Sequence, residues 1–171
     1  MSDRRVAVVG ATGVVGRTMI QILEERAFPL ADLRLLASSR SAGMKVVTRW
    51  GEVLVEDLEA ADPAAVDIAL FSAGRNRSLS YAPVFAAAGS VVVDNSSAFR
   101  QDPSVPLVVA GVNDGAIAGH QGIIANPNCT TMTLMVAAGP LHRAAQLKRL
   151  VATSYQSVSG SGQRGMDELS R

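Results

Sequence analysis

The sequence predicts an α/β fold built on a doubly wound, mostly parallel sheet. Short apolar strands alternate with helical segments from Val6 to Ala125, and a glycine-rich turn joins the first strand to the first helix. Hydrophobic residues make up 48% of the chain, whereas charged residues make up 18% and aromatic residues 4%. This composition suits helices packed closely on both faces of a buried sheet.

Apolar runs and their periodicity place the individual elements. Buried strands are expected at residues 6–9, 33–37, 67–71, 91–93, 107–109 and 123–125. Apolar residues at helical spacing predict a helix over 14–25, and an alanine-rich segment predicts another over 79–88. Two edge strands are expected at 45–48 and 52–55, around Trp50-Gly51.

The pattern changes after Cys129. A helix is expected from Cys129 to Ala138, where Gly139-Pro140 would bend or end it. Residues 147–157 are the longest strand candidate, and a further helix opens between 160 and 171.

The sequence stops inside this last predicted helix without a capping signal, so we expect a fragment of a longer protein. We assign 1–128 to a nucleotide-binding domain and 129–171 to the start of a second, α+β domain.

Charge and cysteine content narrow the function classes. Sixteen basic and fifteen acidic residues give a net charge of +1, which offers no electrostatic case for nucleic acid or an anionic membrane. No secretory segment or membrane span is visible. The single cysteine excludes an internal disulfide, so we expect a cytoplasmic protein, and we assign no metal site.

Residues 10–16 (GATGVVG) form a GxxGxxG variant of the dinucleotide-binding fingerprint of a Rossmann-type domain. Glycines allow the tight turn and a close backbone approach to a pyrophosphate, while the following helix offers free N–H groups. The alternative is a turn without a ligand. The strand–helix context favours nucleotide binding.

The end of the second strand discriminates between NAD and NADP. An NAD site usually has an acidic residue there for the ribose 2′-hydroxyl, whereas this chain reads Ser38-Ser39-Arg40-Ser41. Arg40 suits a 2′-phosphate through charge-assisted hydrogen bonds. A solvated surface arginine is the alternative, but its position favours NADP.

Cys129 follows Asn128, a good N-cap residue, and so falls in the first turn of a helix. The positive end of the helix dipole favours the nucleophilic thiolate. A buried, inert cysteine is the alternative reading.

A nucleophilic cysteine beside a nicotinamide predicts oxidation of an aldehyde through a thioester, which water or phosphate then releases. Arg100 and Asn95, in the segment 94–100 (DNSSAFR), supply donors for a phosphate site, although this segment also reads as an ordinary polar turn.

Six segments together resemble aspartate-semialdehyde dehydrogenase, in that family's order and at its spacing. They are 10–16, 37–43 (ASSRSAG), 71–74 (FSAG), 94–100, 126–131 (NPNCTT) and 154–162 (SYQSVSGSG). The resemblance implies a dinucleotide-binding domain joined to a catalytic and dimerisation domain, and a homodimer when the protein is intact. It also implies reversible NADPH-dependent reduction of aspartyl phosphate to aspartate semialdehyde and phosphate, on the route to lysine, methionine and threonine.

The resemblance also implies roles for individual residues. Cys129 matches the family's nucleophile, Arg100 its phosphate-binding arginine, and Gln156 the glutamine that orients the substrate or acyl intermediate. The residues expected to bind the cofactor are Gly10, Thr12, Gly13, Val14, Val15, Ser39, Arg40, Ser41, Ser72, Gly74, Ser159 and Gly160.

Two departures from the family pattern stand out. The family often has an acidic residue just before the Val-Asn pair, whereas this chain reads Ala110-Gly111-Val112-Asn113. Neither His120 nor His142 matches the general acid/base histidine, which the family takes from later sequence. The chain alone is therefore expected to be inactive.

Two alternative functions follow. One is a non-catalytic NADP-binding module. The other is an N-acetyl-glutamyl-phosphate reductase, whose NPGCY motif fits Asn128 and Thr130 less well.

Overall fold

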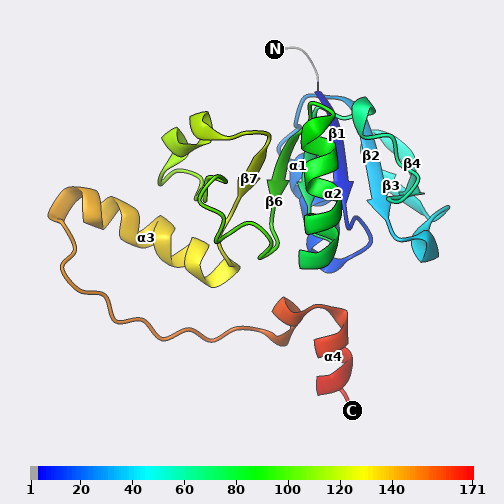
Figure 1. Cartoon of the computed structure of the whole chain (residues 1–171). Coiled ribbons are helices and arrows are strands. Elements are labelled where there is room, and N and C mark those ends of the chain that lie inside the picture. The colour runs from blue at the N-terminus through cyan, green and yellow to red at the C-terminus, as the bar shows by residue number, and fades with distance from the viewer. Residues whose placement is uncertain (1–3) are drawn as a thin grey trace.

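The computed structural model describes residues 4–171, apart from the side chains of residues 161, 163 and 164. Seven strands form one sheet in the order β3-β4-β2-β1-β5-β6-β7, parallel throughout except for the antiparallel pair β3–β4 (Figure 1). The strands are β1 (Arg4–Val9), β2 (Leu30–Ala37), β3 (Lys45–Thr48), β4 (Gly51–Asp57), β5 (Ile68–Phe71), β6 (Val91–Asp94) and β7 (Ile123–Ala125). The helices are α1 (Val14–Glu25), α2 (Arg75–Ala87), α3 (Cys129–Ala145) and α4 (Gln163–Leu169). The predicted doubly wound fold is confirmed.

The sheet is buried on both faces because alternate residues of each strand point in opposite directions. On β1, Val8 packs in the cluster that contains Leu23 of α1, whereas Val9 packs in the cluster that contains Phe85 of α2. Helices α1 and α2 therefore cover opposite faces of the sheet (Figure 1). Phe85 also meets Phe71 of β5 edge to face, with ring centroids 5.5 Å apart.

The predicted edge pair β3–β4 is confirmed, but the strand expected at 107–109 is wrong. Only Leu107 forms a bridge, to Ala125 of β7. The N–H of Val109 donates instead to the side chain Oδ1 of Asn113, at 2.7 Å. This local hydrogen bond occupies an N–H group that would otherwise pair with a neighbouring strand, and asparagine side chains often form such bonds in turns.

The predicted bounds of helices α2 and α3 need correction. Helix α2 begins at Arg75 rather than at 79. The sequence does not predict its first turn, because this turn is polar and carries no apolar periodicity. Helix α3 continues through Gly139-Pro140 and ends at Ala145, so these residues do not end it at Ala138. Proline removes one main-chain hydrogen bond but leaves the neighbouring ones, and the helix stops only where Gln146 adopts a left-handed conformation, with φ of 51°.

The long strand expected at 147–157 is absent from the described chain. Its side chains are exposed, with Val151 at 78% and Tyr155 at 96% of full exposure. A strand needs a hydrogen-bonding neighbour, and no described strand pairs with this segment. It leads to a short 3-10 helix, η4 (Val158–Ser161), and then to α4, both near the carboxyl ends of the parallel strands (Figure 1). The helix predicted over 160–171 is thus confirmed only for Gln163–Leu169.

Of the helices that the described residues form, none combines the length and apolarity of a membrane span.

Candidate active site

The glycine turn between β1 and α1 is shaped by close backbone contacts. Gly10 has a φ of +89°, and a Cβ there would lie 2.9 Å from the main-chain carbon and oxygen of Ser72. A Cβ on Gly16 would collide with the Gly10 oxygen and lie 2.8 Å from the Cα of Ala11. These two glycines therefore let α1 and the end of β5 pack against the turn.

Gly13 has a different role, because its φ of −76° is open to any residue. It is the N-cap of α1 and makes no side-chain capping bond within the described chain. The N–H groups of the first turn are thus left for a bound anion. They border a cavity of about 540 Å³ at the carboxyl edge of the sheet. Its lining comprises Thr12, Gly13, Val14, Val15, Arg17, Ser72, Gly74, Ser159, Gly160 and Gly162.

Residues far apart in sequence meet in this larger cavity. The glycine turn supplies one wall, the end of β5 a second, and η4 a third. Ser159 and Gly160, which the family resemblance implies as cofactor residues, line the same cavity as the glycine turn. Arg17 also lines this cavity, and the sequence does not predict it, because the apolar periodicity of α1 marks only the buried face of the helix.

A smaller cavity of about 190 Å³ lies on the other side of the turn. Its lining comprises Gly10, Thr12, Gly13, Ala37, Ser38, Arg40, Leu58, Ser72, Ala73 and Arg77. Of Ser39, Arg40 and Ser41, which are all expected to bind the cofactor, only Arg40 lines it. Ser39 and Ser41 lie in the same 3-10 turn, η1 (Ser39–Ser41), and the Ser41 hydroxyl is 3.4 Å from the Thr12 hydroxyl. Sequence reasoning missed Arg77, although it follows closely on the end of β5, where ligands of such sheets bind.

Asp94, at the end of β6, is a fully buried carboxylate. Its Oδ1 accepts hydrogen bonds from the Ser78 hydroxyl, at 2.7 Å, and from the Ser96 N–H, at 3.2 Å; its Oδ2 accepts from the Ser96 hydroxyl, at 2.7 Å. These donors satisfy the carboxylate without a cation. The residue that looked like part of a polar turn therefore anchors α2 and the 95–100 loop to β6.

Arg100 is half-buried and held by two main-chain oxygens. Its Nε donates to Asn126 at 2.9 Å, and its Nη2 donates to Asn95 at 3.1 Å. Asn95 is itself fixed by its N–H, which donates to the oxygen of Phe71 at 2.9 Å. The two predicted phosphate residues are thus brought together, directly beside the loop that leads to Cys129.

Cys129 is the first residue of α3, and its side chain is exposed. The predicted N-cap is confirmed: the Asn128 Oδ1 accepts the Thr131 N–H at 2.8 Å and the Thr130 hydroxyl at 3.2 Å. In the described chain the Oδ1 of Asn126 is buried without a hydrogen-bond partner. An exposed thiol on a capped helix start is accessible to a carbonyl carbon.

Gln156 is exposed, and its side chain lies against Gly160. His120 has a local role, since its Nδ1 accepts the Gly122 N–H at 3.0 Å. The described residues contain no group of three side chains suited to a metal ion.

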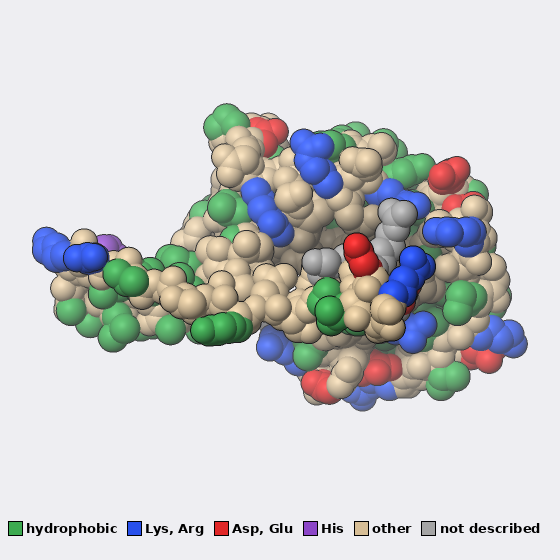
Figure 2. Space-filling view, turned by 90° about the horizontal axis from the view of Figure 1, so that it is seen from below, with side chains coloured by type: hydrophobic (Ala, Val, Ile, Leu, Met, Phe, Trp, Pro, Cys, Tyr) green, Lys and Arg blue, Asp and Glu red, His purple; other side chains and the backbone are tan. Residues whose placement is uncertain are grey.

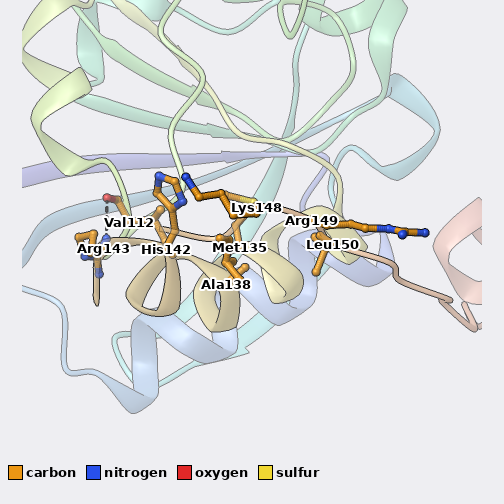
Figure 3. Close-up of a pocket in the computed structure, with 10 residues that line it drawn as sticks. Val112, Met135, Ala138, His142, Arg143, Lys148, Arg149 and Leu150 are labelled. Atoms are coloured by element: carbon orange, nitrogen blue, oxygen red, sulfur yellow. Dashed lines mark hydrogen bonds between the residues drawn. The ribbon is translucent and has the colours of Figure 1, made fainter. Parts of the chain in front are cut away.

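A third cavity, of about 510 Å³, lies between α3 and residues 147–150 (Figure 3). Met135, Ala138 and His142 face it from α3, and Arg143 crosses to donate to the Val112 oxygen at 3.3 Å. Seen from below, hydrophobic side chains lie along the arm that α3 and the segment after it form beside the body of the molecule (Figure 2). On α3 itself, Val136 and Leu141 are more than half exposed. This helix is thus only partly covered by the described chain.

Comparison with known proteins agrees with this geometry. The chain is 55% identical over 168 residues to aspartate-semialdehyde dehydrogenase of Mycolicibacterium smegmatis, covering 96% of this chain and 49% of that protein. The crystal structure of aspartate semialdehyde dehydrogenase II from Vibrio cholerae complexed with ASA superposes with a TM-score of 0.95 at 48% identity, covering 99% of this chain and 51% of the other. The structure of the Candida albicans enzyme with NADP has a TM-score of 0.65 at 25% identity, covering 85% and 48%.

The chain spans about half the length of the curated relatives it matches. The family model for the NAD-binding domain of semialdehyde dehydrogenase matches residues 5–120. This match covers most of the chain, including the glycine turn and Arg100. The chain therefore belongs to the semialdehyde dehydrogenase family, of which it contains the NAD-binding domain.

Proposed function

We propose that this chain is the nucleotide-binding half of an NADP-dependent aspartate-semialdehyde dehydrogenase, with residues 1–128 binding the cofactor and residues 129–171 beginning the catalytic and dimerisation domain. One observation carries the proposal: the glycine turn, the end of β5 and the Ser159-Gly160 turn share a single cavity of about 540 Å³. Three separate segments of the family pattern converge there. A glycine turn that binds no ligand gives no reason for the Ser159-Gly160 turn to lie beside it.

The proposed cofactor site fits a dinucleotide along its whole length. The N–H groups at the start of α1 would hold the pyrophosphate, because a helix start attracts anions. Arg40 would hold the 2′-phosphate, and no carboxylate lines the smaller cavity. When bound, the nicotinamide supplies the redox chemistry of the reaction, by exchanging hydride with the carbonyl carbon.

Cys129 would be the nucleophile. In the reductive direction its Sγ attacks the acyl carbon of aspartyl phosphate, forms a thioester and displaces inorganic phosphate. Arg100 would bind the departing phosphate, since two main-chain oxygens hold its guanidinium beside the Cys129 loop. Gln156 would orient the acyl group. We also propose a homodimer of the intact protein, in the reducing cytoplasm, where a free thiol persists.

The function is tested by assaying the 171-residue chain for NADPH formation from aspartate semialdehyde, with and without phosphate. We expect NADPH binding, measured by calorimetry, but no turnover, because proton transfer needs a positioned acid/base group. Phosphate-dependent turnover would instead show that these residues contain a complete site. Binding of neither NADPH nor NADH by the folded chain would contradict the proposal.

A second test restores the rest of an enzyme. The chain is joined to the carboxyl-terminal half of the Mycolicibacterium smegmatis relative. We expect phosphate-dependent activity on aspartate semialdehyde, which Cys129→Ser abolishes while leaving NADPH affinity unchanged. A folded, NADPH-binding chimera without activity would favour the non-catalytic module.

A further inference from the structure

We propose that Arg77 is a second guanidinium contact for the 2′-phosphate of NADP and, with Arg40, sets the preference for NADP over NAD. This inference rests on the proposed function, which places NADP in these cavities. It adds a specificity residue from α2, an element that carries none of the predicted 2′-phosphate contacts.

Topology brings the two arginines together. Arg40 follows β2 and Arg77 follows β5, and these strands flank β1 on its two sides. The carboxyl ends of neighbouring parallel strands lie at one edge of the sheet, so both side chains line the same cavity of about 190 Å³. The hydroxyls of Ser38 and Thr12 border it as well.

The charges in this cavity are unbalanced. Neither Arg40 nor Arg77 has a salt-bridge partner among the described residues, in contrast to Arg5, Arg34 and Lys45. Two positively charged side chains that line one small cavity favour an anion bound between them. A phosphate monoester, with up to two negative charges and three acceptor oxygens, can bond to both.

The position of Arg77 within α2 points the same way. The first turn of α2 contains Arg75 and Arg77 and no acidic residue. The N-cap of this helix, Gly74, makes no side-chain hydrogen bond in the described chain. Cations at the positive end of a helix dipole oppose helix stability. A phosphate bound there would interact favourably with the guanidinium and with the dipole at once.

Arg75 provides a matched control. It lies in the same helical turn and carries the same charge, but it does not line the cavity. A contact with the 2′-phosphate predicts an effect at Arg77 that Arg75 does not share. A general electrostatic effect of the helix start predicts similar effects at both positions.

The test is calorimetric titration of the 171-residue chain with NADPH and with NADH, which lacks the 2′-phosphate. We expect Arg77→Ala to weaken NADPH binding about tenfold, the value of one charge-assisted hydrogen bond, and NADH binding by less than about twofold. Arg75→Ala should weaken NADPH binding by less than about threefold, as for an exposed charge. Arg77→Gln, which keeps most of the side-chain length, gives a second variant if Arg77→Ala fails to fold.

Four outcomes would overturn the role of Arg77. Equal weakening of NADPH and NADH would assign Arg77 to the adenosine, and equal effects of Arg75→Ala and Arg77→Ala would assign the change to overall charge. Unchanged binding in a folded Arg77 variant would remove the contact but leave the NADP preference of the parent chain intact. If the parent chain itself bound NADH as tightly as NADPH, the NADP part of the proposed function would fail, and the inference with it.

Discussion

The Nε of Arg100 donates a hydrogen bond of 2.9 Å to the main-chain oxygen of Asn126, three residues before Cys129. The loop after β6 and the loop after β7 are thereby joined at the carboxyl edge of the sheet. A second bond, from the Asn126 N–H to the Asp94 oxygen at 3.2 Å, reinforces the connection. Hydrogen bonds therefore connect the proposed phosphate residue to the loop that leads to the proposed nucleophile.

Replacing Arg100 should change how Cys129 reacts with charged reagents. We expect Arg100→Ala to lower the alkylation rate with anionic iodoacetate by about threefold relative to neutral iodoacetamide, the effect of one partly exposed charge. Both rates can be followed by mass spectrometry. Arg75→Ala is the control, since it removes an equal charge from a different helix. An unchanged ratio would mean that Arg100 provides no anion site beside the thiol.

The buried Asp94 cluster should matter for stability. Ser78→Ala removes one of the donors to a fully buried carboxylate, so we expect the free energy of unfolding to fall by about 1–3 kcal/mol. Urea denaturation measures this directly. Ser80→Ala is the matched control, because the Ser80 hydroxyl is exposed and only contacts the Asn76 oxygen of its own helix. A loss equal to that of Ser80→Ala would show that Ser96 satisfies Asp94 alone.

Gly16→Ala should damage both the fold and the nucleotide site. The added methyl would collide with the Gly10 oxygen, so we expect a loss of about 1–3 kcal/mol from overpacking, with weaker NADPH binding as the turn moves. Gly115→Ala is the control, because no atom lies within 4 Å of a Cβ built there. Denaturation and calorimetry on both variants give the two readouts. Full NADPH affinity in Gly16→Ala would contradict the close packing at this glycine.

Much of the fold could be predicted because β1 and its neighbours carry local information. A four-residue apolar run between polar ends is buried wherever it lies, and a glycine turn before an amphipathic helix has few alternatives. The predictions failed where a distant partner decides the outcome. Residues 147–157 have the composition of a strand, but a strand exists only beside another, and no described strand pairs with this segment.

The candidate site shows the same division. Gly10, Arg40 and Cys129 could be predicted, because each follows a strand at a recognisable motif. Arg77 and the burial of Asp94 could not, since both depend on which strands are neighbours in the sheet. The contacts of Arg77 and Asp94 join residues that are far apart in the sequence, and local periodicity does not predict the order of strands in a sheet.

The ion pair between Arg5 and Asp67 predicts a pH-dependent contribution to stability. The Arg5 Nη2 donates to the Asp67 Oδ1 at 2.7 Å, and the Arg5 N–H donates to Oδ2 at 2.9 Å. These hydrogen bonds lower the pKa of Asp67 from 3.8 to about 2, and the side-chain bond contributes more than the main-chain bond. A carboxylate whose pKa is lowered by folding stabilises the native state above its unfolded pKa, and this contribution is lost as the pH falls through the folded value.

Asp67→Asn should therefore reduce the free energy of unfolding at pH 7, and the difference from the parent chain should shrink between about pH 4 and pH 2. Urea midpoints, measured from pH 7 down to the lowest pH at which the parent chain stays folded, test this. Glu59→Gln removes an equal charge and should show a smaller difference at pH 7. A difference that stayed constant or grew as the pH fell would mean that Asp67 acts through its shape and not through its charge, because only the ionised form is favoured by Arg5.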